Sequence, residues 1–162
     1  VYKRQGNGFE CQEFFKDGIT LIVPARHPWA MRSAVDPADL LDEPLLMREP
    51  TSGTRRRILT ELAKHDIGLD DLDIFLELGN AEAIVRTVEA GYGVSFISTL
   101  AAEWALNLGR VVSVPVVDFD LQRTIFMVRR ELDTPNRAQE AFWNFVHAPS
   151  NADLLRLAGQ EA

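Results

Sequence analysis

The sequence predicts an α/β domain with a mostly parallel β-sheet. Short runs rich in β-branched residues alternate with windows in which apolar residues recur every three or four positions. Capping residues stand before several of these helical windows, and glycines follow them. Strands that alternate with helices in this order are typical of βαβ units. The chain has 162 residues, of which 46% are hydrophobic, so it is long enough for one good core without requiring a second.

The sheet is expected to begin with a buried strand at 19–24, which a turn at 27–28 follows. Asp36 can cap a short helix that has Pro37 in its first turn, where a missing backbone N–H costs no hydrogen bond. A second strand, short and apolar, is expected at 45–48.

Two amphipathic helices and a third strand follow. Thr51 and Ser52 stand where caps stand, before the first of these helices. The strand is expected at 74–78, and Asn80 caps the second helix, which ends at Gly91. The apolar faces of the two helices consist of Ile58, Leu59 and Leu62 in the first and of Ile84, Val85 and Val88 in the second.

The last third of the chain repeats the alternation. A strand is expected at 93–97, a helix capped by Ser98 runs to Leu108, and two further strands lie at 111–117 and 124–128. A last helix begins at Thr134 and Pro135 and is ended by Pro149. Its buried face is expected to consist of Ala138, Phe142, Phe145 and Val146.

The two ends of the chain carry no clear pattern. Val rather than Met at position 1 suggests a fragment, and residues 1–5 are interpreted as a disordered cloning or assembly scar. Residues 149–162 are expected to form a frayed tail. The sequence has no apolar run long enough to cross a bilayer and no secretory signal pattern, which predicts a cytoplasmic protein.

Composition predicts no metal, no cofactor and no direct grip on nucleic acid. The single cysteine, Cys11, cannot form an internal disulfide, and His27, His65 and His147 do not have the spacing of zinc ligands. The formal net charge is −7, whereas binding to phosphate backbones needs clustered Lys and Arg. If the protein acts on DNA, another segment is expected to do so.

The most informative stretch is 48–55, Arg-Glu-Pro-Thr-Ser-Gly-Thr-Arg. A strand ends there and a helix begins, so several backbone N–H groups converge without intrahelical partners. The hydroxyls of Thr51, Ser52 and Thr54 are expected to point into the same small volume, at the positive end of the helix dipole. The stretch therefore predicts a site for a carboxylate, sulfate or phosphate.

A simpler interpretation of the same residues is structural. Thr51 or Ser52 would then only cap the helix, and Gly53 would only allow the turn. The basic run at 55–57 could draw anions toward the turn, or it could be a solvated helix face balanced by Glu61. The residues by themselves leave both interpretations open.

No group of residues predicts an enzyme. The glycines of 91–93 do not make a dinucleotide fingerprint, because Phe96 stands where the third glycine is needed. The segment 93–97 lacks the last glycine of a nucleophile elbow, and His27 has no nearby carboxylate partner in the sequence. The acidic cluster at 70–73 lacks the Gly and Glu of an EF-hand loop.

The order of segments resembles the effector-binding domain of LysR-type transcriptional regulators over residues 9–148. The resemblance rests on Ile-Thr-Leu-Ile-Val-Pro at 19–24 with His27-Pro28, and on Leu-Leu-Met-Arg-Glu-Pro-Thr-Ser-Gly-Thr-Arg at 45–55. It also rests on Leu-Glu-Leu-Gly-Asn at 76–80 and on Val-Glu-Ala-Gly-Tyr-Gly-Val-Ser-Phe-Ile-Ser at 88–98. The ordered set is much more specific than any one of its motifs.

The resemblance implies a fold like that of type II periplasmic binding proteins, with two α/β subdomains and the effector between them. Residues 6–148 would then form the effector-binding domain, with 19–128 as the second subdomain and 129–148 as a return to the first. The family implies DNA binding through an N-terminal helix-turn-helix and assembly as homodimers or homotetramers, with no membrane partner. Because most of the first subdomain would be missing, the rings of Phe142 and Phe145 are expected to be bare and to promote aggregation.

The resemblance also assigns the candidate ligand-binding residues. The turn Thr51-Ser52-Gly53-Thr54 matches the family's second-subdomain effector loop, which implies a small, anionic effector. Pro50, Ile125 and Phe126 are further candidates for the walls of the cleft.

Two other functions fit the same fold class. An extracytoplasmic solute-binding protein would need a signal peptide upstream, whereas a regulator would need a helix-turn-helix there. An enzyme such as a prephenate-dehydratase-like domain is disfavoured, because no acid, base or nucleophile set was found.

Overall fold

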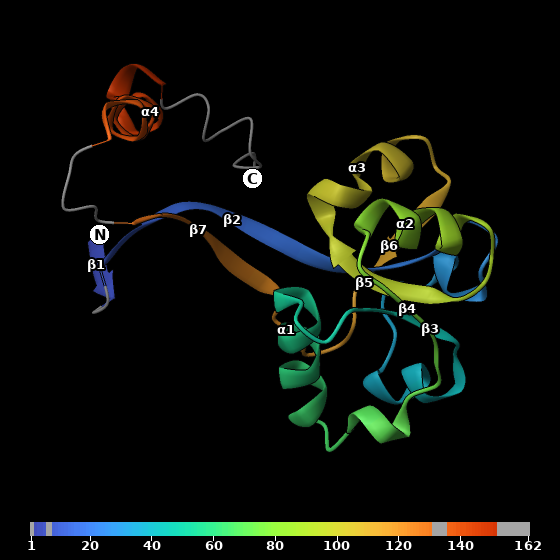
Figure 1. Cartoon of the computed structure of the whole chain (residues 1–162). Helices are drawn as coiled ribbons and strands as arrows, with labels where there is room; N and C mark the ends of the chain where they lie inside the picture. Colours follow the sequence, from blue (N-terminus) through green and yellow to red (C-terminus); the bar gives the residue numbers. More distant parts are fainter. Residues whose placement is uncertain (1, 6–7, 131–135, 152–162) are drawn as a thin grey trace. The chain divides into compact units, whose positions relative to one another are not determined.

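The computed structural model describes residues 2–5, 8–130 and 136–151 of the chain (Figure 1). It divides into two compact units. We call residues 18–122 the central unit and residues 1–17 with 123–162 the terminal unit. Each unit is described by itself.

The central unit is built on a mixed sheet with strand order β6-β2-β5-β3-β4. Strand β3 (Leu45–Arg48) runs parallel to both β4 (Ile74–Leu78) and β5 (Val94–Ser98). Strand β2 (Phe9–Pro24) runs antiparallel to β5 and to β6 (Val111–Val114). The predicted βαβ units are therefore confirmed for β3, β4 and β5.

Helices cover both faces of this sheet (Figure 1). Helix α1 (Gly53–Ala63) connects β3 to β4 and packs its buried Ile58 and Leu62 on one face. Two short 3₁₀ helices, Pro28–Met31 and Pro37–Asp42, add Trp29 and Leu40 to the same core. A third, Leu69–Asp71, follows α1 along the chain and has no buried residue. Helices α2 (Ala81–Glu89) and α3 (Thr99–Asn107) pack on the other face. The second face has a core that consists of Ile22, Leu46, Ile84, Val85, Val88, Ile97, Ala102, Ala105 and Val111.

Alternation along β3 explains the two cores. Leu45 and Met47 point to the core beneath α1, whereas Leu46 points to the core beneath α2 and α3. A strand that is buried on both faces must be apolar throughout, which is why β3 has no polar residue before Arg48.

The terminal unit contains β1 (Tyr2–Gln5), the first part of β2, β7 (Gln122–Arg130), α4 (Arg137–His147) and a 3₁₀ helix at Pro149–Asn151. Strands β1 and β7 both pair with β2. Where β2 and β7 leave this unit, the buried Asp17 carboxylate accepts two hydrogen bonds from the Arg123 guanidinium, at 2.8 and 2.6 Å.

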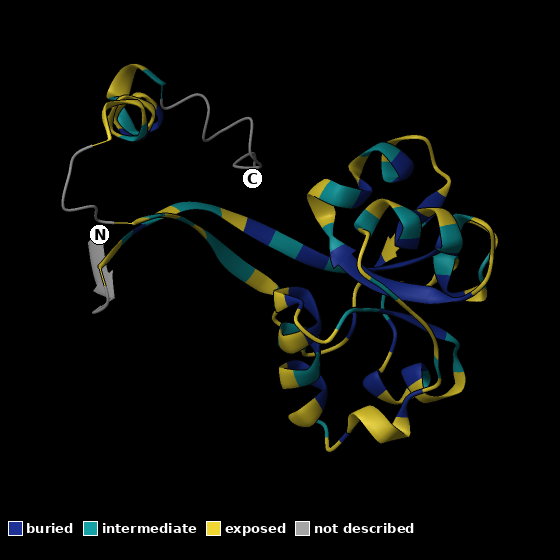
Figure 2. Ribbon diagram, viewed as in Figure 1, coloured by how far each residue is buried: buried dark blue, intermediate teal, exposed yellow. Residues whose placement is uncertain are grey.

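Helix α4 turns a different face inward than the sequence predicts (Figure 2). Val146 is buried as expected, but its buried companion is Trp143, and Ala138 is exposed. The Arg129 guanidinium lies 4.6 Å from the centroid of the Trp143 ring, which holds the indole against β7. Phe142 and Phe145 are more than half exposed, so their placement on the buried face from periodicity is wrong. Their exposure agrees with the separate expectation, from the resemblance, that these rings are bare.

Most predicted elements appear within a residue or two of their expected bounds, but several ends differ. Strand β2 begins at Phe9 rather than Ile19. The strand expected at 111–117 ends at Val114, because Pro115 has no backbone N–H to donate to a neighbouring strand. Residues 2–5 form β1 by pairing with 9–12, although no side-chain pattern indicates a strand there. Backbone hydrogen bonding across a hairpin does not require such a pattern.

The rest of the predicted tail, 152–162, lies outside the described residues. Within the described ranges, no helix is both long and apolar enough to cross a membrane. The same residues contain no group of three or more His, Cys, Asp or Glu placed to hold a metal ion.

Candidate functional site

The turn at 50–55 lies at the carboxyl edge of the central sheet. Neighbouring strands β3 and β5 end there, and their connections leave in opposite directions, β3 through α1 to β4 and β5 through α3 to β6. Their following helices also cover opposite faces of the sheet. Open α/β sheets bind ligands outside the carboxyl ends of strands at such a switch point. The fold therefore places the turn where a ligand is expected.

Ser52 caps helix α1. Its Oγ accepts hydrogen bonds from the backbone N–H of Thr54 at 3.2 Å and of Arg55 at 3.5 Å. The backbone N–H of Ser52 donates to the carbonyl of Glu49 at 3.0 Å, which closes the turn. The capping interpretation is thus confirmed for Ser52, and a role of this hydroxyl in ligand binding stays a prediction.

The hydroxyl-bearing residues of the turn differ in their exposure. Ser52 and Thr54 are buried, whereas Pro50, Thr51 and Gly53 are exposed. Of the three hydroxyls, the one on Thr51 is therefore the most open to a molecule arriving from solvent.

Gly53 is not explained by the geometry of the turn. Its φ angle lies outside the left-handed region, and a Cβ added at this position would meet no atom within 4 Å. The fold would accept alanine here, which favours helix formation more than glycine does. A bare backbone at the first residue of α1 does leave room for a ligand to approach the N–H groups of the helix end.

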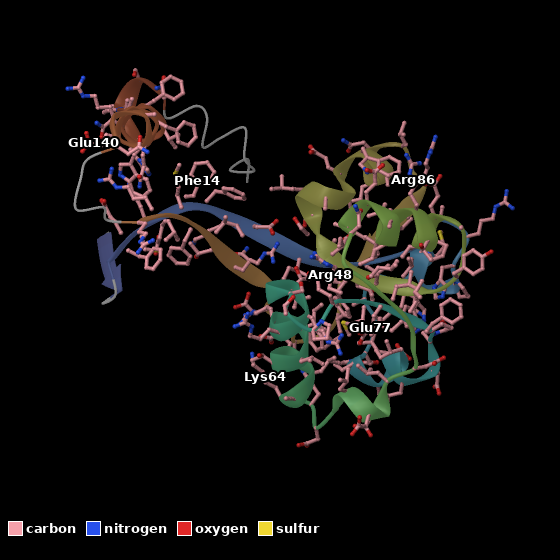
Figure 3. All side chains as sticks on the ribbon, in the orientation of Figure 1. Phe14, Arg48, Lys64, Glu77, Arg86 and Glu140 are labelled. Carbon is pink, nitrogen blue, oxygen red and sulfur yellow. The ribbon has the colours of Figure 1, made fainter. Side chains whose placement is uncertain are left out.

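Two ion pairs, Arg48–Glu49 and Arg55–Glu77, involve residues in or next to the turn. Figure 3 labels Arg48 and Glu77. The Arg55 side chain is buried and donates to the Arg48 carbonyl at 3.0 Å and to the carboxylate of Glu77. The Arg48 guanidinium donates to both oxygens of Glu49, at 2.8 and 3.0 Å. These hydrogen bonds from Arg48 hold the pKa of the Glu49 carboxyl below its usual range.

The basic run at 55–57 is largely neutralised by acidic partners. The Arg57 guanidinium lies 3.1 Å from the Glu61 carboxylate and 3.4 Å from that of Asp120. Of the three arginines, Arg56 is the exposed one. The run is therefore mainly structural. The sequence pointed to Glu61 as a partner, but it could not show Glu77 and Asp120, which are distant along the chain.

Two other predicted wall residues, Ile125 and Phe126, belong to β7 in the terminal unit. Ile125 is half-buried and Phe126 is exposed. The central unit ends at Gln122, before both residues. Their part in a cleft stays a prediction, as does the assignment of 19–128 to one subdomain.

Gly93 has a structural role at the start of β5 that depends on a contact with a distant residue. It has a φ of +147°, and a Cβ there would overlap the carbonyl oxygen of Pro44 and lie 3.1 Å from the carbonyl carbon. The backbone N–H of Val94 donates to the same Pro44 carbonyl at 2.9 Å. Only glycine lets β5 start this close to β3.

Hollows among the described residues of the central unit lie away from the turn. One, of about 380 Å³, is lined by residues 18–21, 114–116 and 119–122. Another, of about 420 Å³, is lined by 24–26, 89–91 and Arg110. The case for a ligand at the turn rests on the strand ends and on the helix end.

Comparison with known proteins gives a consistent family. A family model described as the LysR substrate binding domain matches residues 2–149. The CbbR regulator of Xanthobacter flavus is 44% identical over 144 residues, which cover 87% of this chain and 42% of that protein. An HTH-type transcriptional regulator of Methanocaldococcus jannaschii is 36% identical over 142 residues, which cover 88% of this chain and 48% of that protein. The chain thus spans about half the length of these curated relatives.

Solved structures share the fold. The regulatory domain of CcmR from Synechocystis, solved with 2-PG, superposes with a TM-score of 0.76 at 23% identity and covers 91% of this chain and 70% of that chain. The effector-binding domain of QuiR, solved with shikimate, superposes with a TM-score of 0.73 at 22% identity. The match covers 90% of this chain and 66% of that chain. This likeness confirms the predicted fold class, that of LysR effector domains of the type II periplasmic-binding-protein type.

Proposed function

The chain belongs to the LysR substrate-binding domain family, and we propose that it is the effector-sensing part of a regulator that binds DNA through another segment. Its net charge of −7 makes it a poor partner for phosphate backbones. Its curated relatives are named transcriptional regulators and are about twice its length. These names favour the regulator over the solute-binding protein that the sequence left open.

The proposed effector is a small anion that binds at the turn 50–54. The observation that carries this proposal is Gly53, which leaves the N-terminal backbone of α1 bare although the fold does not require glycine. The positive end of the α1 dipole and the exposed hydroxyl of Thr51 add to the attraction for an anion. Two structural neighbours were solved with small molecules, 2-PG and shikimate, which supports a small-molecule effector.

The remaining parts of the proposal concern the whole regulator. We place 19–128 in the second subdomain, 129–148 in the first, and Ile125 with Phe126 on the walls of the cleft. The regulator would act on promoter DNA, in line with the relatives' names. Its location in the cytoplasm and its assembly as a homodimer or homotetramer are further parts of the proposal. Its role is binding without chemistry.

Calorimetric titration of the intact regulator with a panel of carboxylates, phosphate and sulfate tests the effector site. Thr51→Ala is expected to weaken the strongest binder about threefold to tenfold, because one hydrogen bond to a charged group is lost. Thr60→Ala is the matched control, since Thr60 is an exposed threonine on helix α1 and its hydroxyl donates to the carbonyl of Arg56 at 2.9 Å.

Gly53→Ala separates binding from folding. The free energy of unfolding should stay the same or rise by up to about 1 kcal/mol, because alanine is the better helix former. Binding should nevertheless weaken, because the new methyl group covers the backbone that the anion approaches. Unchanged affinity in both Thr51→Ala and Gly53→Ala would remove the turn from the effector site.

A further inference from the structure

Two guanidinium groups lie beside the turn and are held differently. The Arg55 side chain, 8% exposed, is fixed by the Arg48 carbonyl and by Glu77, which lies on the neighbouring strand β4. The Arg48 side chain, 20% exposed, bonds its own sequence neighbour Glu49, whose side chain is 35% exposed. The first pair ties α1 to two strands of the sheet, whereas the second ties together adjacent residues.

The Arg48–Glu49 pair contributes little to the stability of the fold. Neighbouring residues need no ion pair to stay close, and a partly exposed pair contributes little to stability. The backbone of Arg48 is held independently, because its carbonyl accepts the hydrogen bond from Arg55. The guanidinium of Arg48 can therefore change partner without disturbing β3 or α1.

The Glu49 carboxylate offers Arg48 the same chemistry as an anionic ligand. A guanidinium recognises carboxylate and phosphate alike, through two parallel N–H···O hydrogen bonds. The pair in this structure has that geometry, with N–O distances of 2.8 and 3.0 Å. Glu49, like an ordinary glutamate, is ionised at neutral pH, and these hydrogen bonds lower its pKa further. It thus competes with an incoming anion for Arg48 and also repels it.

We propose that Arg48 is an anchoring residue for the effector anion and that Glu49 is a tethered competitor, which occupies Arg48 until the anion displaces it. This inference rests on the proposed function of the turn and adds to it a residue pair that sets affinity. An effector that also contacts Thr51 and the N-terminal backbone of α1 gains more binding free energy than is lost when Arg48 releases Glu49. A simple anion such as phosphate makes fewer of these contacts at once and binds more weakly than the effector.

The test is calorimetric titration of the 162-residue chain with inorganic phosphate at fixed ionic strength. Glu49→Gln should bind phosphate about threefold more tightly, because the loss of an exposed ion pair frees Arg48. Arg48→Gln should bind about tenfold more weakly, because a charge-assisted pair of hydrogen bonds is lost. In the Arg48→Gln background, Glu49→Gln should lose most of its effect, because Glu49 acts mainly through Arg48.

Glu82→Gln is the matched control. It removes the same charge from an exposed pair with Arg86 in the central unit, at an N–O distance of 3.8 Å, and should leave the affinity for phosphate unchanged. A second readout is the pKa of Glu49, followed by carboxyl carbon NMR. That pKa should rise toward its ordinary value when phosphate saturates the chain, since Arg48 then bonds the ligand.

The outcomes separate the two proposals. Phosphate binding that Thr51→Ala weakens but Glu49→Gln leaves unchanged would overturn the tethered-competitor role and leave the effector site standing. An equal gain from Glu49→Gln with and without Arg48 would also overturn it, because the effect would then be general electrostatics. If no variant, Glu49→Gln included, bound phosphate, the effector site and the pair's role would both be refuted.

Discussion

The central unit buries aliphatic side chains on both faces of its sheet and buries more apolar residues than it exposes, whereas the described part of the terminal unit exposes more large apolar side chains than it buries. Both of the extended hydrophobic cores belong to the central unit. In the described part of the terminal unit, the buried apolar residues are Cys11, Trp143 and Val146. The exposed ones in that unit are Phe9, Phe126, Val128, Phe142 and Phe145.

This difference in packing between the two units decides in which unit binding variants can be compared without loss of folding. The turn at 50–55 lies in the unit that has its own two-sided core, so its variants report on binding against a stable background. The exposed rings of the terminal unit form the kind of surface that normally has a partner.

Truncation in the core beneath α1 should be the most damaging change. Leu62→Ala is expected to lower the free energy of unfolding by about 3–4 kcal/mol, because a fully buried side chain leaves a cavity. Phe145→Ala, which removes a larger but exposed side chain of the terminal unit, should change it by less than about 0.5 kcal/mol. Urea unfolding measures both, and equal losses would show that the two units do not differ in packing.

Gly93→Ala should lower the free energy of unfolding almost as much as Leu62→Ala does. The new Cβ would overlap the carbonyl oxygen of Pro44 and would force β3 and β5 apart. We expect the free energy of unfolding to fall by about 3 kcal/mol. Gly91→Ala is the control, because that glycine also has a positive φ but no atom within 4 Å of an added Cβ. Its loss should be about 1 kcal/mol, and a larger loss for Gly91→Ala than for Gly93→Ala would refute the contact.

Glu61 should make the central unit sensitive to acid. Burial alone would raise the pKa of this carboxyl, but a hydrogen bond from Lys64, one from the Asp120 backbone and the charges of Lys64 and Arg57 lower it overall. Because the folded pKa lies below the ordinary value of 4.5, the stabilisation is present above that pH and is lost as the pH falls through the folded pKa.

Unfolding midpoints between pH 7 and pH 3 check this dependence. Glu61→Gln should lower stability at pH 7 and flatten its fall below about pH 4.5. Glu103→Gln, at an exposed position on α3, serves as the comparison and should follow the wild type. Parallel acid curves for wild type and Glu61→Gln would contradict the role of this carboxylate.

Loss of the cap should have a smaller effect than any of these core changes. Ser52→Ala is expected to cost about 1 kcal/mol, because the backbone N–H groups of Thr54 and Arg55 lose their acceptor. Ser52→Asp should retain most of the stability, since aspartate also caps helices, yet its charge should repel an anion from the turn. Thermal unfolding beside phosphate titration separates the two effects, and tight phosphate binding by Ser52→Asp would argue against an anion at this turn.

The smallest change in stability is expected for the double variant Phe142→Ser and Phe145→Ser. Both rings are exposed, so the unfolding midpoint should hardly move, while the solubility limit of the chain should rise. Light scattering against concentration measures the second quantity. A drop in the midpoint of several degrees would show that the rings are packed in solution.

Local signals made much of the central unit predictable. The strands at 45–48 and 74–78 have the bounds expected from their apolar runs, and Ser52 and Asn80 cap their helices as expected. Contacts between distant residues were not predictable. The pairing partners of β2 include β7, about a hundred residues later, and the ion pair of Arg55 with Glu77 spans 22 positions.

The same limit applies to the site. The turn and its cap could be found from residues 48–55, because strand, turn and helix end are neighbours in the chain. The charge balance around the turn could not, since it depends on side chains that folding brings in from β4 and from Asp120. For α4, periodicity alone could not choose between Trp143 and its phenylalanine neighbours, because the choice depends on the cation–π contact with Arg129.

The most direct test of the central claim, that the turn binds an anion, is an NMR titration of the chain with inorganic phosphate. The backbone N–H signals of Thr51, Gly53 and Thr54 should shift along one saturating curve, because these groups lie at the N-terminus of α1. The signal of Tyr92, which precedes β5 at the opposite edge of the sheet, should stay in place. Signals of the turn that do not move, or that move no more than Tyr92 and without saturation, would contradict the claim.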